Sequence, residues 1–157
     1  MNASYASAKG TMPASAHLDT LSVVELRRYR LRPESREKLV DLFDREFVET
    51  QEAAGMRVIG QFRDLDAPDS FVWMRGFSDM ASREKALQAF YSGPVWAEHR
   101  NAANGTMVNS DNVLLLRPLS PQNTFRMTDN GRPPRDAKGS RRGLLVELGH
   151  RPDLDPT

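Results

Sequence analysis

The chain has 157 residues, which fits one domain with tails, and its hydrophobic fraction of 39% is enough for one core. The 22 Lys and Arg residues nearly balance 21 Asp and Glu residues, so the basic surplus typical of nucleic-acid-binding domains is absent. The chain lacks cysteine, which excludes disulfides, thiolate metal sites and a cysteine nucleophile. No apolar run approaches the roughly 18–20 residues that span a bilayer. We therefore expect a cytoplasmic protein that binds neither nucleic acid nor membrane.

Residues 1–20 carry almost no large apolar side chains and lack the apolar core of a secretory signal, so we expect a disordered leader. The first predicted strand is Ser22–Leu31. Its alternation places Val24 and Leu26 on one face, and the opposite face carries Glu25, Arg27 and Tyr29. This second face mixes charge with an aromatic ring, which suggests a pocket or an interface.

A long helix is predicted over Arg32–Ala54. Pro33 suits the first helical position, and Gly55 is a typical stop. The apolar stripe of this helix recurs every four residues at Leu39, Phe43 and Phe47.

A β-hairpin is predicted next, with arms Met56–Arg63 and Phe71–Phe77 joined by the turn Asp64–Ser70. Both arms alternate with period two, which divides their side chains between two faces. We expect one set beneath the helices, namely Val58, Phe62, Val72 and Met74. We expect the other set on the opposite face of the sheet, namely Ile59, Gln61, Trp73 and Arg75.

Two more helices, Asp79–Tyr91 and Pro94–Asn104, precede a last strand at Asn109–Pro118. The order β-α-β-β-α-β predicts an α+β, ferredoxin-like domain over residues 21–118, with a four-stranded antiparallel sheet and helices on one face. The other face would carry Tyr29, Ile59 and Trp73, too much apolar surface to leave in water. A second copy that packs sheet against sheet would cover it, so we expect a homodimeric α+β barrel.

Residues 119–157 are rich in Arg, Pro and Gly and are expected to form an extended tail. The tail contains one strand-like run at 144–148. This run is either the start of a degenerate second copy of the domain, because it echoes the sequence of residues 23–26, or an unrelated edge strand.

Three segments together resemble the NIPSNAP family: VVELRRYRLRPESREKLVDLF, EAAGMRVIGQFRDLDAPDSFVWMRGF and FYSGPVWAEHR. The resemblance extends over residues 23–118 and keeps the motifs in the family order. It implies a dimeric α+β barrel, in agreement with the patterning argument. Family members often carry two tandem units, whereas this chain has one. The family implies no single activity.

The chain has no nucleophile elbow, phosphate-binding loop, dinucleotide fingerprint or HExxH motif. Its histidines are His17, His99 and His150, and the first and last fall in the leader and the tail. We therefore expect no metal site and no tightly bound cofactor.

Eight residues are the candidate site. The expected acid–base or catalytic group comprises Tyr29, Arg75 and His99, and the expected substrate-binding group comprises Glu25, Arg27, Gln61, Trp73 and Trp96. Arginine can clamp a carboxylate or enolate, tyrosine can donate a proton, and tryptophan can form an aromatic wall. Some of these residues also have a structural interpretation. Glu25 and the arginines can form an ion-pair network, and His99 can be a packing histidine or, alternatively, an axial haem ligand.

Two functional hypotheses follow. In the first, a homodimeric barrel binds or converts a small organic metabolite in its interior by acid–base chemistry. In the second, a filled barrel is a non-enzymatic interaction module that recruits a partner protein. An open, polar-lined cavity of about 300 Å³ or more favours the first, and a solidly packed interior favours the second.

Overall fold

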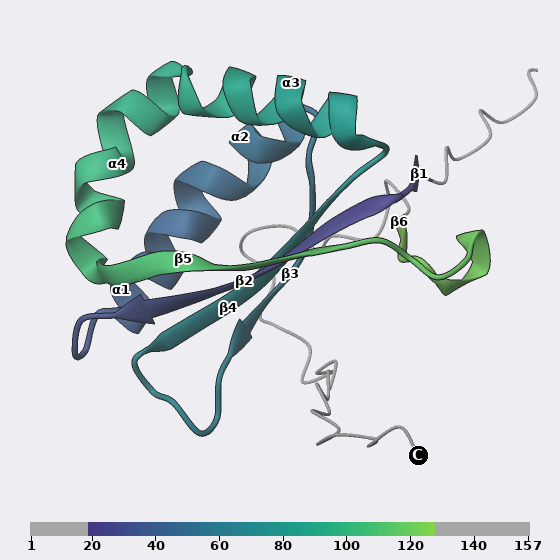
Figure 1. The fold of residues 1–157 in the computed structure, drawn as a ribbon. Helices are drawn as coiled ribbons and strands as arrows, with labels where there is room; N and C mark the ends of the chain where they lie inside the picture. The colour runs from purple at the N-terminus through teal and green to yellow at the C-terminus, as the bar shows by residue number, and fades with distance from the viewer. Residues whose placement is uncertain (1–18, 128–157) are drawn as a thin grey trace, which may run out of the picture.

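The computed structural model describes residues 19–127, so most of the predicted leader, His17, His150 and the strand expected at 144–148 lie outside the described residues. At its centre is a four-stranded antiparallel sheet with strand order β3-β4-β2-β5 (Figure 1). The strands, in chain order, are β2 (Val23–Leu31), β3 (Arg57–Arg63), β4 (Ser70–Phe77) and β5 (Met107–Leu116). This order confirms the predicted ferredoxin-like α+β fold.

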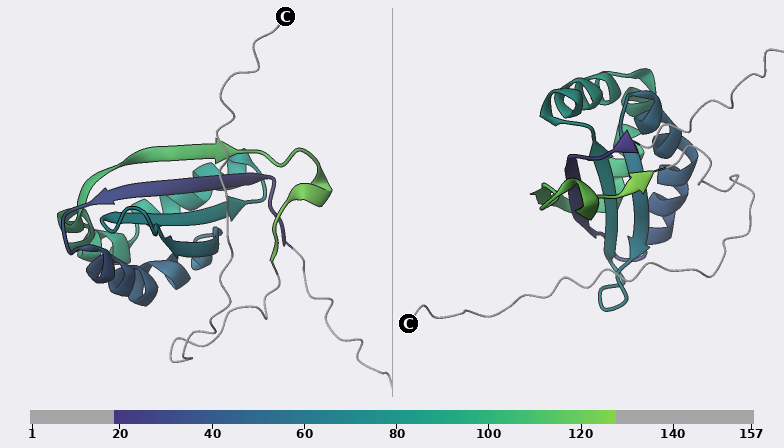
Figure 2. Two further views of the ribbon diagram at one scale, coloured as in Figure 1. Left: turned by 90° about the horizontal axis from the view of Figure 1, so that it is seen from below. Right: turned by 90° about the vertical axis from the view of Figure 1, so that its right-hand side faces the viewer.

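The helices all cover one face of this sheet (Figures 1 and 2). The first helical segment is continuous but passes from α-helix to π-helix and back to α-helix. Two further α-helices follow β4. These helical elements are α1 (Arg36–Leu42), the π-helical segment η1 (Phe43–Phe47), α2 (Val48–Ala53), α3 (Met80–Tyr91) and α4 (Pro94–Thr106). Within the described residues, no helix is both long and apolar enough to span a membrane.

The first helix begins later than the sequence indicated. Pro33 lies in the turn before it, Ser35 occupies the N-cap position, and Glu34 adopts φ +59°, an uncommon conformation for a residue other than glycine. Its end agrees with the prediction, because Gly55 adopts φ +96° directly after α2. The third predicted helix runs two residues further than expected, through Gly105 to Thr106.

The assignment of the sheet faces is wrong for most of the sheet. Tyr29, Phe71 and Trp73 pack in the cluster beneath the helices, whereas Val24, Leu26 and Met74 form a separate cluster on the opposite face. Charged residues normally face water, which is why the sequence argument placed the mixed face outward. Here the charges are paired with one another beneath the helices, so the mixed face can be buried and the face with Val24, Leu26 and Met74 turns outward.

A bulge in β3 explains the remaining differences in this strand. Val58 is opposite Arg75, but Gly60 is opposite Met74, so Ile59 is an extra residue without its own partner. Strict alternation therefore fails after Val58. Gln61 lies opposite Trp73 on the helix side, and Phe62 packs on the outer face, which reverses both predictions.

A clasp formed by the two ends of the described chain covers part of the outer face. Two short strands, β1 (Asp19–Thr20) and β6 (Arg126–Met127), pair antiparallel, and the 3-10 turn η2 (Pro121–Asn123) leads into the second. Leu21 and Phe125 pack on the outer cluster, and the Leu21 side chain occupies the space where a Cβ at Gly76 would lie. Towards β5 the same face is open, because Leu114 and Leu116 are 46% and 40% exposed.

Candidate functional site

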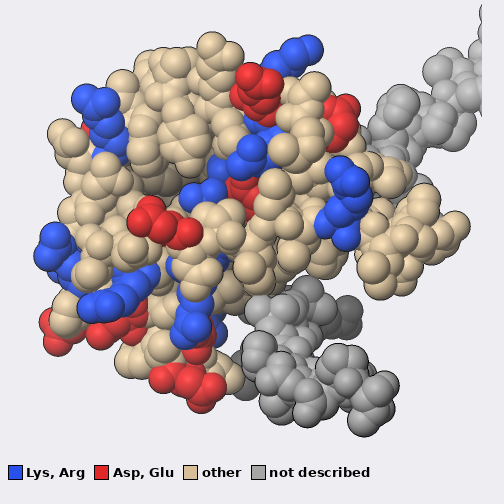
Figure 3. Space-filling model, in the orientation of Figure 1, with Lys and Arg blue, Asp and Glu red and all other residues tan. Residues whose placement is uncertain are grey.

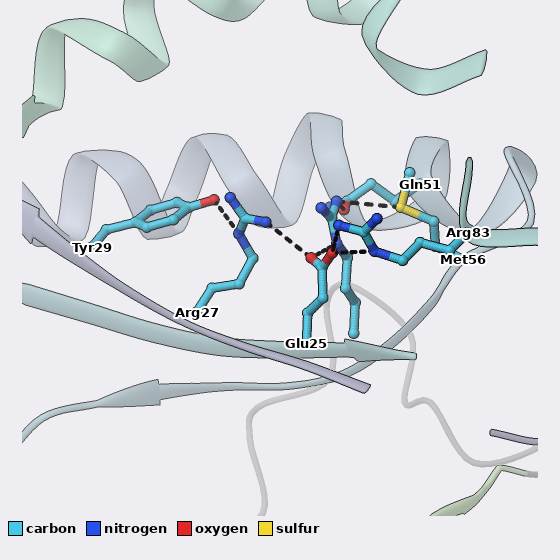
Figure 4. A network of polar contacts seen from close by, with 7 residues as sticks. Glu25, Arg27, Tyr29, Gln51, Met56 and Arg83 are labelled. Carbon is cyan, nitrogen blue, oxygen red and sulfur yellow. Dashed lines mark hydrogen bonds and ion pairs between the residues drawn. The ribbon is translucent and has the colours of Figure 1, made fainter. Parts of the chain in front are cut away.

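The site is built around Glu25, whose carboxylate is completely buried between the sheet and the helices. Its Oε2 accepts hydrogen bonds from Arg75 Nε at 2.7 Å and from Arg27 Nη1 at 2.9 Å. Its Oε1 accepts from Arg83 Nε at 2.7 Å, and Arg83 Nη2 lies 2.6 Å from the same oxygen. Figure 4 shows Glu25 between Arg27 on one side and Arg83 on the other. One carboxylate is thus shared by three guanidinium groups.

Local structure brings these groups together from four elements. Glu25, Arg27 and Tyr29 alternate along β2 and therefore share a face, and the antiparallel register sets Arg75 of β4 opposite Glu25. Arg83 reaches the carboxylate from α3. From α2, Gln51 accepts a hydrogen bond through its Oε1 from Arg75 Nη1 at 3.0 Å.

The electrostatics of the cluster keep Glu25 ionised. Burial alone raises the pKa of the Glu25 carboxyl, but the charge of Arg75 and the hydrogen bonds from the three arginines outweigh it, so the pKa lies below its ordinary value. Glu25 is accordingly a fixed counter-charge and a poor general base at neutral pH.

The pKa of Tyr29 is shifted in the other direction, upward. Burial raises the pKa of its phenol above the ordinary value, although the nearby Arg27 charge opposes this, so Tyr29 is protonated at neutral pH. Arg27 Nε donates to the Tyr29 oxygen at 3.0 Å. The phenol therefore accepts from a cation and keeps its own proton for donation, an arrangement suited to a proton donor or an oxyanion partner.

Next to Tyr29 is a small cavity of about 40 Å³. Its walls are mainly aromatic, and they include Tyr29, Phe43, Phe47, Trp73, Tyr91 and Trp96. Trp73 is 2% exposed, yet its indole Nε1 has no hydrogen-bond partner within residues 19–127. Buried donors are nearly always satisfied by protein or water, so the indole N–H of this cavity-lining residue is available to a hydrogen-bond acceptor.

The eight predicted site residues separate into two groups. Glu25, Arg27, Tyr29, Trp73 and Arg75 lie together, and Trp96 joins them through the cavity wall. The other two do not line the cavity, although Gln61 is the cross-strand neighbour of Trp73. Gln61 Nε2 donates to Asp44 Oδ1 at 2.5 Å, and its Oε1 has no partner among the described residues. His99 is 24% exposed, with its Nε2 3.6 Å from Glu46 Oε2, and it does not line the cavity.

Gln51, Arg83 and Tyr91 contribute to the site but were not predicted from the sequence. Gln51 could have been found, because it continues the four-residue spacing of Leu39, Phe43 and Phe47 and is a polar residue on an apolar stripe. Arg83 gave no such signal, since it lies on a helix with many polar residues. Within the described chain, no group of three or more His, Asp or Glu side chains is arranged to hold a metal ion.

The Glu25 carboxylate should contribute strongly to stability. Replacing it in Glu25→Gln leaves three buried or partly buried guanidinium groups without their anion, and we expect a loss of about 3–5 kcal/mol of unfolding free energy at neutral pH. Because the folded-state pKa of Glu25 is depressed, its contribution is present above the ordinary carboxyl pKa and disappears as the pH falls through the folded-state value. The difference between wild type and variant should therefore shrink in acid, as measured by urea unfolding.

Glu37→Gln is the control for this experiment, because Glu37 also pairs with an arginine, Arg63, but is 59% exposed. We expect it to cost about 1 kcal/mol or less. If Glu25→Gln lost as little unfolding free energy as Glu37→Gln, the structural role given to Glu25 would be contradicted.

Comparison with known proteins gives a consistent result. The NIPSNAP family model matches residues 24–121, whereas a search of the curated proteins found no match. A NIPSNAP-like domain protein from Burkholderia xenovorans, described as uncharacterized, superposes with a TM-score of 0.57 at 28% identity, over 62% of this chain and 85% of that one. A NIPSNAP family protein of unknown function from Agrobacterium tumefaciens gives 0.58 at 19% identity, over 68% and 97%. The family model covers more than half of the chain, and the chain therefore belongs to the NIPSNAP family.

Proposed function

We propose that this NIPSNAP protein binds, and by acid–base chemistry converts, a small organic molecule beneath its helices rather than on the outer face of the sheet. The observation that carries the proposal is the buried, unpartnered indole N–H of Trp73 in the wall of the aromatic cavity. A ligand acceptor would satisfy that donor. The protonated Tyr29 in the same wall would supply the acidic proton.

The chemistry of this arrangement follows from the hydrogen bond between Arg27 and Tyr29. When Tyr29 donates its proton towards a ligand oxygen, negative charge develops on the phenol oxygen, which already accepts from the Arg27 guanidinium. That cation would stabilise the charge as it forms. Glu25 holds Arg27 in place and takes no proton. His99 has no part in this scheme, because it does not line the cavity.

The cavity itself admits only a small part of a ligand, because about 40 Å³ holds little more than a water molecule or one small group. Tyr91, which forms part of its wall, is 41% exposed and so connects the cavity to the surface. Figure 3 shows a hollow between the α3–α4 layer and the sheet in which basic and acidic atoms are visible. The body of the ligand would occupy this hollow.

The second candidate function is an interaction module, and the small cavity volume favours it. The volume is well below the roughly 300 Å³ of an ordinary ligand pocket. In this alternative the Glu25 cluster only joins the sheet to α3. A larger groove of about 700 Å³ lies at the end of the outer face beside Arg28 and Arg30. Arg28 is already paired with Asp64 at 2.8 Å, and Arg30 is exposed to solvent.

A cavity-filling substitution separates these functions. Ala103 is 1% exposed and lines the cavity, so Ala103→Val should fill the space and abolish binding of small aromatic probes while the protein remains folded. Phenol, benzamide and benzoate are suitable probes, with tryptophan fluorescence as the measurement. Ala102→Val, at an exposed neighbouring position on α4, is the matched control and should bind as wild type does.

Saturable binding that is lost only in Ala103→Val supports the proposed function. No saturable signal from wild type with any of the three probes, or equal binding by both valine variants, would favour the interaction module.

We also propose that two copies pack outer face to outer face as a homodimer. Leu114 lies opposite Leu26 and Leu116 lies opposite Val24, so these four side chains form one apolar surface that ends in two exposed leucines. Water contact with this surface is unfavourable, and a second copy with the same surface would remove it.

The double variant Leu114→Lys/Leu116→Lys should place charge in this interface and convert the dimer to a monomer in sedimentation at micromolar concentration. Leu65→Lys is the control, because Leu65 is 92% exposed in the hairpin turn, away from the sheet face. A wild-type protein that sediments as a monomer would contradict the dimer.

A further inference from the structure

We propose that the ligand of this site is an organic carboxylate, whose anionic group binds at the free edge of Arg27 and is favoured by the charge of Arg83. This inference rests on the proposed function and deepens it, because it names the chemical class of the ligand. Although the whole chain carries nearly equal numbers of positive and negative side chains, positive charge is in excess around Glu25.

The imbalance lies in the ratio of cations to anions around Glu25. Arg27, Arg75 and Arg83 all pair with this single carboxylate, which leaves a surplus of two positive charges. Elsewhere in the described chain, some arginines pair one to one with a carboxylate, as in Arg28–Asp64 and Arg45–Glu46, and the unpaired ones, such as Arg30, are exposed. A surplus shared around one buried carboxylate is therefore what distinguishes the site.

Burial strengthens the attraction of this surplus positive charge for an anion. Glu25 and Arg75 are 0% and 1% exposed, and the side chains of Arg27 and Arg83 are only 14% and 26% exposed. Water screens charges weakly in such a place, so uncompensated cations are unfavourable there and attract an anion more strongly than they would at the surface. A neutral ligand of the same shape would gain none of this attraction.

The Arg27 guanidinium is the group best placed to receive the anion. Its Nε donates to Tyr29 and its Nη1 donates to Glu25, while its Nη2 makes no hydrogen bond to any described residue. Its Cζ lies 5.5 Å from the centroid of the Tyr29 ring and 5.6 Å from that of Trp73, which holds the plane of the group. The free edge of Arg27 is thus oriented before a ligand arrives.

The aromatic residues define the rest of the ligand. A carboxylate on Arg27 would have its body beside Tyr29 and Trp73, which face Arg27 and also line the cavity. An aromatic or other apolar body with one hydrogen-bond acceptor would pack there and would satisfy the Trp73 indole N–H. The geometry therefore points to a small aromatic or apolar acid.

Benzoate and benzamide provide the test, because they have nearly the same shape and differ in charge. We expect wild type to bind benzoate at least tenfold more tightly than benzamide in a fluorescence titration. Arg83→Met removes one surplus charge without touching the cavity, and it should reduce that preference at least fivefold while benzamide binding stays the same. Arg63→Met is the control, because Arg63 pairs with the exposed Glu37 and does not line the cavity, and it should keep the full preference.

A second measurement needs no variant. Raising the ionic strength should weaken benzoate binding and leave benzamide binding unchanged, because salt screens only the charged ligand.

The outcomes distinguish this inference from the proposed function. Equal binding of benzoate and benzamide, with both lost in Ala103→Val, would overturn the carboxylate inference and leave the proposed function standing. Failure of every probe to bind would overturn the proposed function itself. A preference for benzoate that survives Arg83→Met but disappears in Arg28→Met would place the anion in the outer groove and overturn the assignment to Arg27.

Discussion

The buried ion pair between Glu25 and Arg75 is the interaction on which the rest of this structure depends. Both residues are almost inaccessible to water, and isolated charges in such a place would be very unfavourable. Glu25 is therefore tolerated only because β2, β4 and α3 each supply a guanidinium group, with Gln51 of α2 as a neutral partner. The cluster thereby fixes how the helical layer lies on the sheet.

This constraint decides the character of both sheet faces. Once the charges pair with one another beneath the helices, the face that carries them can be buried, and the face with Val24, Leu26 and Leu114 is left to face outward. The fold thus has two distinct faces, for which we propose separate roles. One contains a charged and aromatic pocket suited to a small ligand, and the other is an apolar surface suited to a second copy.

The order of the elements and the ferredoxin-like topology could be predicted from the sequence, because period-two alternation and helical spacing are local signals. Which face of the sheet packs against the helices could not be predicted. Apolar residues alternate on both sides of β2 and β4, and charged residues normally indicate exposure to water. The burial of that carboxylate also depends on Arg83, which lies 58 residues beyond Glu25 in the chain and on a separate helix. The β3 bulge at Ile59 and the π-helical segment also left no recognisable signal in the sequence.

The candidate residues were predicted better than their location. Five of the eight lie together because the alternation along β2 and along β4 was inferred correctly, even though the face was not; the register between the two strands comes from the structure. The residues that lie outside the cavity show that spacing along a helix does not by itself predict where a side chain points. His99 shares a helix with Trp96, but it is directed towards Glu46 instead of the cavity.

A crystal structure of the protein soaked with benzoate tests the central claim most directly, namely that the site lies beneath the helices. We predict density for a carboxylate within hydrogen-bonding distance of Arg27 Nη2, with the ring beside Trp73. Benzoate bound only on the outer face of the sheet, with none near Arg27, would contradict the account.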